Sequence, residues 1–238
     1  MSIDSRKTNV LAILTVAVML IAIGMIFFYL PQMRGESGEI LDESFKIFYF
    51  HLPISITSYL AFFVVFVASI MYLREQTHKW DILARSAAEV GISFAFLVLA
   101  TGSIWAKATW GWYWIWEPRL TTSLVFFLVY IGYLMMRKAV EEPEKRARLS
   151  AVFGIVGFAS VPLSFLSIRL WRSAHPLMFG GSAYGSSSGG LEGTSLKLTL
   201  LVNFIAFFLL FGTMLAYKVQ NEEVQEEIDE IKQSIKLR

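Results

Sequence analysis

The sequence predicts an all-α membrane protein with six transmembrane helices and both termini in the cytoplasm. Only 17% of its 238 residues are charged, whereas a soluble domain has about a quarter of its residues charged. Six apolar segments, each near the ~20 residues that a helix needs to cross a bilayer, recur along the chain. Lys and Arg are unevenly divided between the two sets of segments that connect them. These observations together predict a multi-pass bundle.

The expected spans follow from the limits of the apolar segments. The first has no small-x-small cleavage pattern after it, so we expect it to be retained rather than removed as a signal peptide. The third and fourth are the shortest and should lie nearly upright in the bilayer, and Pro162 should kink the fifth. The six segments are residues 10–30, 54–73, 87–104, 120–136, 149–168 and 196–217.

The chain divides into a six-span domain, residues 1–217, and an acidic tail, residues 218–238. The tail has apolar residues at spacings of 4, 3 and 4, which predicts an amphipathic cytoplasmic helix that docks a partner or lies against its own chain. A Gly/Ser-rich stretch, residues 180–193, is expected to be a linker rather than a lid. The apolar residues of the tail are Val224, Ile228, Ile231 and Ile235.

Orientation follows from the basic residues. Of the 21 Lys and Arg residues, 14 lie before the first span, after the last, or in the second and fourth connections. The positive-inside rule places these segments in the cytoplasm. The connection between the third and fourth spans therefore faces outward, as do His51 and His175, whereas His78 lies on the cytoplasmic side.

Composition excludes several kinds of chemistry. A net charge of +2 with dispersed basic residues does not indicate a nucleic-acid partner. The chain has no cysteine, which excludes disulfides, thiolate ligands and thioether links to a cofactor. Any metal chemistry must come from His, Met, carboxylates or a bound cofactor.

The outward connection has an unusual concentration of tryptophan in "TWGWYWIWEPRLTT", residues 109–122. Trp favours membrane interfaces, but an interfacial belt spreads its aromatics over many helix ends. In a strand, alternate tryptophans would face one way; in a helix, they would pair at i, i+4. Because Pro118 disfavours helix at Glu117, we expect a short interfacial helix or an irregular ribbon with a flat aromatic surface. The five tryptophans are Trp105, Trp110, Trp112, Trp114 and Trp116.

A flat aromatic surface suits a large planar ligand. Haem iron accepts two imidazoles as axial ligands, which His51 and His175 could supply from the same side of the membrane. Arg119, Arg169 and Arg172 could pair with the propionates. Individually, such histidines are more often hydrogen-bonded and such arginines more often meet lipid phosphate. Together they favour an outward-facing haem site.

The stretch "GSIWAKATWGWYWIWEPRLTT", residues 102–122, resembles the tryptophan-rich WWD signature of the haem-handling superfamily that includes CcmC, CcmF and CcsA. Chain length, six spans and one outward histidine on each side of the motif resemble the CcmC family. The resemblance implies a protein of a prokaryotic cytoplasmic (inner) membrane that holds haem b at the outer face and presents it to the chaperone CcmE. It also implies the ABC-type subunits CcmA and CcmB and the small protein CcmD as partners, with ATP hydrolysis serving release of the loaded chaperone.

By the same resemblance, the tryptophans contact haem, and His51 and His175 are its axial ligands. Glu117 stands where the signature usually has Asp, so its carboxylate is displaced by one methylene. The sequence contains no conspicuous acid–base pair that would indicate an enzyme. The histidine that becomes covalently attached to haem belongs to the chaperone. The alternatives are a haem-exporting permease subunit of an ABC transporter, a b-type cytochrome and a structural subunit.

Overall fold

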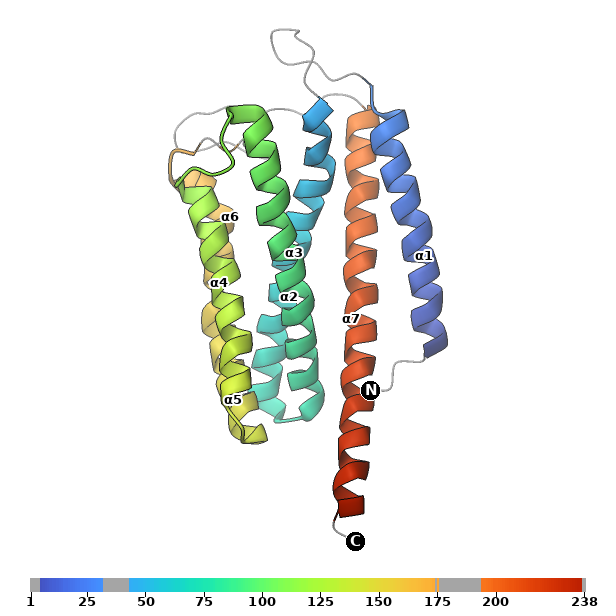
Figure 1. Ribbon diagram of the computed structural model, residues 1–238, viewed down its shortest axis with the longest axis vertical. Helices are drawn as coiled ribbons and strands as arrows, with labels where there is room; N and C mark the ends of the chain where they lie inside the picture. Colours follow the sequence, from blue (N-terminus) through green and yellow to red (C-terminus); the bar gives the residue numbers. More distant parts are fainter. Residues whose placement is uncertain (1–4, 32–42, 174, 176–193, 237–238) are drawn as a thin grey trace.

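The computed structural model describes residues 5–31, 43–173, 175 and 194–236, and these residues form helices without any strand (Figure 1). The predicted Gly/Ser linker lies outside the described residues. The helices are α1 (Ser5–Gly24), α2 (Phe48–Glu75), α3 (His78–Trp110), α4 (Pro118–Ala139), α5 (Pro143–Gly157), α6 (Ser160–Leu170) and α7 (Thr194–Lys236). A π-helical turn, Met25–Tyr29, extends α1, and a 3-10 turn, Glu43–Ile47, precedes α2.

Six stretches of the described chain are helical, long and apolar enough to cross a membrane, which confirms the predicted number of spans. The fifth span consists of two helices, α5 and α6. The six stretches are Ser5–Tyr29, Glu43–Glu75, His78–Trp110, Pro118–Ala139, Pro143–Leu170 and Thr194–Gln225.

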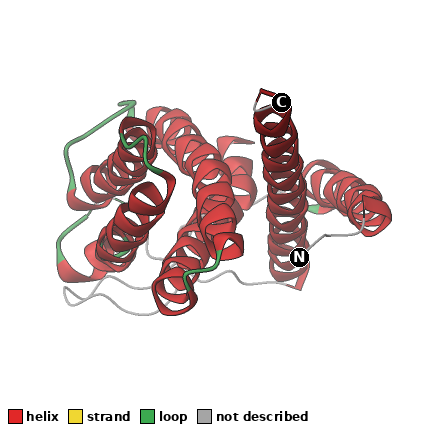
Figure 2. Cartoon of the chain, turned by 90° about the horizontal axis from the view of Figure 1, so that it is seen from below, coloured by secondary structure: helices red, strands yellow, loops and turns green. Residues whose placement is uncertain are grey.

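The antiparallel helices α2 and α3 form the centre of the bundle (Figures 1 and 2). On one side, α4 packs on α3, α5 packs on α2, and α6 packs on α4; on the other side, α7 packs against both central helices. Helix α1 lies at the outer edge and packs on α7 (Figure 2). The first turn of α1 and the last turns of α7 lie at the same end of the molecule (Figure 1).

Helix α3 is longer than predicted. The expectation that the third span is among the shortest was wrong, because the helix has 33 residues. It continues through Trp105 and Trp110 until Gly111, whose φ of +79° ends it in a left-handed conformation that glycine adopts readily. The charged residues near its ends limit the apolar segment but do not interrupt the helix.

The two prolines act as predicted. Glu117 is extended, with φ −102° and ψ 161°, and Pro118 is the first residue of α4. In the fifth span, α5 ends at Gly157 and α6 begins at Ser160. Pro162 has no N–H to donate to the carbonyl of Phe158, so the regular hydrogen-bond pattern is interrupted there.

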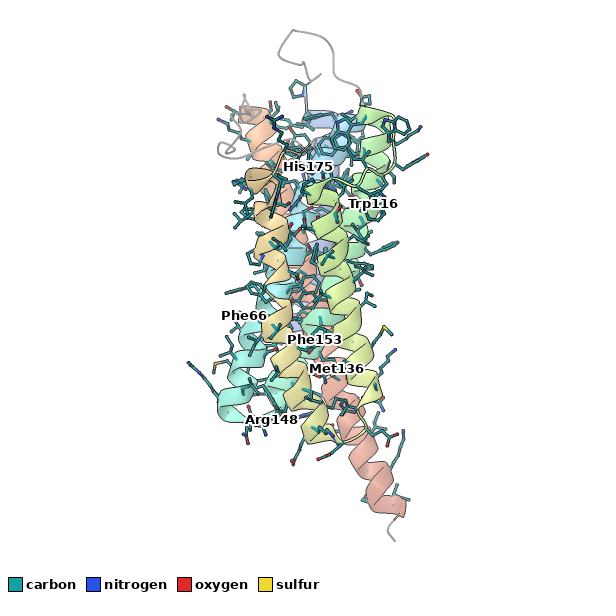
Figure 3. The ribbon with its side chains drawn as sticks, turned by 90° about the vertical axis from the view of Figure 1, so that its left-hand side faces the viewer. Phe66, Trp116, Met136, Arg148, Phe153 and His175 are labelled. Carbon is teal, nitrogen blue, oxygen red and sulfur yellow. The ribbon has the colours of Figure 1, made fainter. Side chains whose placement is uncertain are left out.

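The predicted tail continues α7 without a break as far as Lys236. Ion pairs join α7 to α3: Lys218 Nζ lies 2.6 Å from Glu89 Oε2, and Arg85 Nη1 lies 2.6 Å from Glu222 Oε2. Beyond them α7 extends past the rest of the bundle (Figures 1 and 3). The four apolar tail residues are all exposed, so in this structure they do not pack against the rest of the described chain.

Small side chains allow α2 and α3 to approach closely. A Cβ atom placed on Gly91 would lie 2.9 Å from Cβ of Ala61 and 3.0 Å from the ring of Phe62. Ala87, Ala88 and Ala95 of α3 are fully buried. Helices in membranes associate mainly through such close packing, so this contact organises the centre of the bundle.

We expect Gly91→Ala to destabilise the bundle by about 1–3 kcal/mol, because the added methyl group would force α2 and α3 apart. Thermal unfolding of the purified protein in detergent measures this effect. Gly212→Ala is the matched control: no atom lies within 4 Å of a Cβ there, so the change should be neutral or stabilising. Equal melting temperatures for Gly91→Ala and the wild type would contradict the close contact.

Candidate functional site

A cavity of about 290 Å³ lies at the end of the bundle where α3 ends and α4 begins. Its walls come from α2, α3, α4 and the segment after α6, and most of its lining is apolar. Figure 3 shows His175 and Trp116 together at this end of the molecule. Of the ten site residues predicted from the sequence, six line the cavity: His51, Trp105, Trp110, Trp114, Arg119 and His175.

The cavity brings together the two histidines that are far apart in the sequence. The ring centroids of His51 and His175 are 6.3 Å apart, and the ring planes are inclined by 40°. His51 lies in the first turns of α2, whereas His175 follows α6 on a segment without regular structure. The arrangement places two imidazoles at one cavity, as predicted.

The His51 ring is held against α3. Its Nδ1 lies 2.9 Å from the hydroxyl of Thr101, and that hydroxyl donates to the carbonyl of Leu97 at 2.7 Å. Because the hydroxyl proton is used for Leu97, the Thr101 oxygen accepts a proton from Nδ1–H. In the neutral imidazole this leaves Nε2 with the lone pair that a metal requires.

The imidazole ring of His51 packs against Gly102, where no side chain occupies the space. A Cβ atom on Gly102 would lie 3.1 Å from Cε1 of His51. Trp105, one turn further along α3, packs edge-on against His51 at 6.0 Å between centroids. Phe45 and Phe48 pack on Trp105 in turn, at 5.8 and 6.2 Å. His51 is only 7% exposed as a result.

The tryptophans do not form one flat surface, which corrects the prediction. Residues 111–117 are irregular, as in one of the two expected forms, but Trp105 and Trp110 belong to α3. The rings of Trp114 and Trp116 meet edge to face, at 78°. Trp112 and Trp116 are 67% and 77% exposed and lie outside the cavity.

Trp114 differs from the exposed pair. It is half-buried at the cavity wall, and its indole N–H is buried with no hydrogen-bond partner in the described structure. A buried donor without an acceptor is costly. The N–H is therefore available to an acceptor on a ligand.

Arg119 is a buried cation without a carboxylate partner among the described residues. It is 9% exposed and donates to the carbonyl of Ser164 at 2.5 Å. Its guanidinium lies 5.7 Å from the centre of the Tyr59 ring. Since a buried charge is costly unless it is paired, this site favours an anionic ligand group.

The other two predicted arginines lie outside the cavity. Arg172 is exposed, and Arg169 packs over the ring of Phe165 at 5.0 Å. The structure therefore brings one of the three arginines to the two histidines.

Glu117 also lies outside the cavity, at its edge. Its Oε1 accepts a hydrogen bond from the backbone N–H of Leu120 at 2.8 Å and caps α4. Its Oε2 accepts the hydroxyl proton of Ser173. The Ser173 oxygen in turn accepts the backbone N–H of His175 at 3.0 Å.

Sequence reasoning missed Thr101, Gly102 and Ser173 as individual site residues. Gly102 begins the tryptophan motif, but a glycine next to a motif gives no sign of a ring packed against it. Thr101 and Ser173 act through partners 50 and 56 residues away. No local pattern in the sequence indicates such contacts.

The fold and this cavity define a multi-pass helical membrane protein with two histidines, three tryptophans and a buried arginine around one cavity at an end of the helix bundle. The family model described as "Heme exporter protein C" (CcmC) matches residues 1–234, and the chain belongs to this family.

Curated relatives agree with the family. The chain is 33% identical over 215 residues to Heme exporter protein C of Bradyrhizobium diazoefficiens, covering 89% of this chain and 77% of that protein. It is 30% identical over 199 residues to the protein of the same name from Paracoccus denitrificans, covering 84% and 80%. A ccmC-like mitochondrial protein of cytochrome c biosynthesis from Marchantia polymorpha is 28% identical over 188 residues, covering 77% and 76%.

Proposed function

We propose that this protein binds haem b between His51 and His175 at the outer face of the cytoplasmic membrane and delivers it to the chaperone CcmE during cytochrome c biogenesis. Membership of the Heme exporter protein C family supports a role in haem handling. The spacing of the two imidazoles is the observation that supports the ligand assignment most directly.

Two imidazoles on opposite faces of one iron, each at a metal–nitrogen distance of about 2 Å, have ring centroids about 6 Å apart. The centroids of His51 and His175 are 6.3 Å apart. The Thr101 hydrogen bond leaves Nε2 of His51 as the available ligand atom. The separation of the two rings is therefore compatible with both imidazoles binding one iron.

The rest of the cavity also suits haem. Trp105, Trp110 and Trp114 supply aromatic surface for the macrocycle. Arg119 supplies a positive charge for a propionate. Bound haem would supply a reversible iron–imidazole attachment, and the absence of cysteine leaves no thiol to capture it through a thioether.

The size and place of the cavity favour delivery over passage through the bundle. At about 290 Å³ it lies at the lower end of the range of ligand pockets, so part of a haem would remain accessible to another protein. Beneath it, the centre is filled by Phe62, Phe126 and Tyr130, which are fully buried. This packing gives no support to the alternative of a haem-exporting permease.

The family assignment supports a set of proposed partners. We infer that CcmE receives the haem, that CcmA, CcmB and CcmD assemble with this chain, and that lipid surrounds its exposed apolar helices. The chain itself supplies binding and orientation, and the histidine that becomes covalently attached belongs to the chaperone. Nothing in the site calls for a nucleic acid.

The central experiment is the visible spectrum of the detergent-purified protein after reconstitution with haem. We expect a six-coordinate low-spin spectrum for the wild type. His51→Ala and His175→Ala should each give a five-coordinate high-spin spectrum and bind haem more than ~100-fold more weakly, a larger loss than changes in the residues behind a ligand cause. The double variant should also fail to load CcmE.

His78→Ala is the matched control, because His78 begins α3 at the opposite end of that helix from the cavity. It should leave the spectrum and the loading unchanged. A wild-type protein that binds no haem, or a double variant that loads CcmE normally, would refute the proposed function.

We expect Thr101→Val to weaken haem binding about 10–100-fold, since it removes the acceptor that orients His51 but keeps the shape of the side chain. Thr101→Ser keeps the hydroxyl and should bind nearly as the wild type does. Haem titration and the rate of haem loss to apomyoglobin measure both variants. Equal binding by Thr101→Val and Thr101→Ser would show that this hydrogen bond is unimportant.

Arg119 can be tested with haem and its dimethyl ester, which lacks the propionate charges. The wild type should prefer haem by about 10–100-fold, the usual range for a hydrogen bond to a charged group. Arg119→Ala should lose this preference, whereas Arg172→Ala, outside the cavity, should keep it. A preference that survives Arg119→Ala and disappears in Arg172→Ala would reassign the propionate contact to Arg172.

A further inference from the structure

We propose that Glu117 is a positioning residue that holds His175 in place through Ser173 and does not itself contact haem. The inference rests on the proposed function, because the residue that Glu117 would hold in place, His175, is one of the two proposed iron ligands. The contacts that support it join the tryptophan segment to the segment that follows α6.

Three hydrogen bonds form a continuous chain from Leu120 through Glu117 and Ser173 to His175, and their donors and acceptors are consistent. A carboxylate only accepts, so the Ser173 hydroxyl donates to Glu117 Oε2. The serine oxygen is then free to accept, and the backbone N–H of His175 donates to it at 3.0 Å. A charge-assisted bond to the carboxylate is stronger than a neutral one, so it fixes the serine and, through it, the histidine backbone.

The position of His175 makes such a contact necessary. Helix α6 ends at Leu170, and residues 171–173 and 175 have no regular structure. The backbone of His51, by contrast, is part of α2. A ligand on an irregular segment reaches a fixed geometry only when side-chain contacts replace the missing helical hydrogen bonds.

The alternative roles of Glu117 fit the structure less well. It does not line the cavity. Although Arg119 is only two residues away, the Glu117 carboxylate accepts its hydrogen bonds from Leu120 and Ser173. The buried guanidinium therefore keeps its positive charge for a ligand, while the carboxylate is used between two segments of protein.

The length of the side chain matters because Glu117 uses both oxygens. Capping α4 alone would be served equally well by Asp, which is a preferred N-cap residue. The additional contact with Ser173 requires the carboxylate to extend from the N-cap position of α4 to a residue 56 positions further along the chain. Glu117→Asp therefore separates the two roles: the cap should survive and the contact with Ser173 should be weakened.

The test compares Ser173→Ala, Ser173→Thr and Glu117→Asp in the full-length, haem-loaded protein. Ser173→Ala removes the link but leaves the cap of α4 intact. We expect part of its spectrum to change from six-coordinate low-spin to five-coordinate high-spin and its haem to be lost to apomyoglobin about 10-fold faster. Added imidazole should restore the low-spin spectrum, because it replaces the displaced ligand.

Glu117→Asp should behave like Ser173→Ala, and Ser173→Thr like the wild type. Ser160→Ala is the matched control, since its hydroxyl bonds locally to the carbonyl of Gly157 and Ser160, at the start of α6, does not line the cavity. It should leave the spectrum and the rate of haem loss unchanged.

A second measurement does not depend on haem. Hydrogen–deuterium exchange of peptides covering residues 171–175 should increase in Ser173→Ala and remain unchanged in Ser160→Ala. Unchanged exchange, or a Ser173→Ala protein that keeps its six-coordinate spectrum and rate of haem loss, would overturn the role of Glu117. In the second case, loss of haem by His175→Ala would still leave the proposed function standing.

Discussion

The close contact between α2 and α3 determines where the first histidine lies. Gly91 and Gly102 are eleven residues apart, about three helical turns, so they share one face of α3. At Gly91 the missing side chain admits Ala61, and at Gly102 it admits the ring of His51. The same helix face thus sets the spacing of the two central helices and the depth of the ring. The cavity is a consequence of how this pair packs, not an addition to it.

The opposite wall depends on polar contacts between α2, α4 and α6. Arg119 of α4 donates to the carbonyl of Ser164 in α6, and the hydroxyls of Tyr59 and Ser123 lie 3.2 and 3.1 Å from the Ser164 hydroxyl. Neutral carbonyl and hydroxyl groups accept hydrogen bonds from the N–H groups of the guanidinium without neutralising its charge. Burial in a poorly polarisable environment strengthens the remaining field. A cation that lacks a carboxylate partner among the described residues, beside two imidazoles and apolar rings, would favour a ligand that is flat, apolar and acidic at its edge.

Hydropathy was sufficient to predict six spans, because each apolar segment is long enough to cross the bilayer. It underestimated α3, since the apolar segment stops near Lys107 and Arg85, whereas the helix stops only where Gly111 adopts a positive φ. The sequence could predict that His51, His175 and Arg119 lie near the tryptophans, because all of them fall at the same ends of the predicted spans, and these three residues line one cavity. Tryptophans at alternate positions, however, fit either a strand or a helix, and residues 111–117 adopt neither conformation. The roles of Thr101 and Ser173 depend on contacts between distant segments, which periodicity does not encode.

The backbone of His51 belongs to a helix, whereas that of His175 lies on an irregular segment, and this difference bears on the proposed delivery of haem. Moving His51 out of place would require unwinding the start of α2 or breaking its contact with α3. Moving His175 requires breaking the contacts of a short irregular segment, and a typical hydrogen bond there contributes only about 1 kcal/mol. An incoming imidazole from a chaperone would therefore replace His175 more readily than His51. His51, which is carried by a helix and bonded to α3, is the residue that would continue to hold the iron during such an exchange.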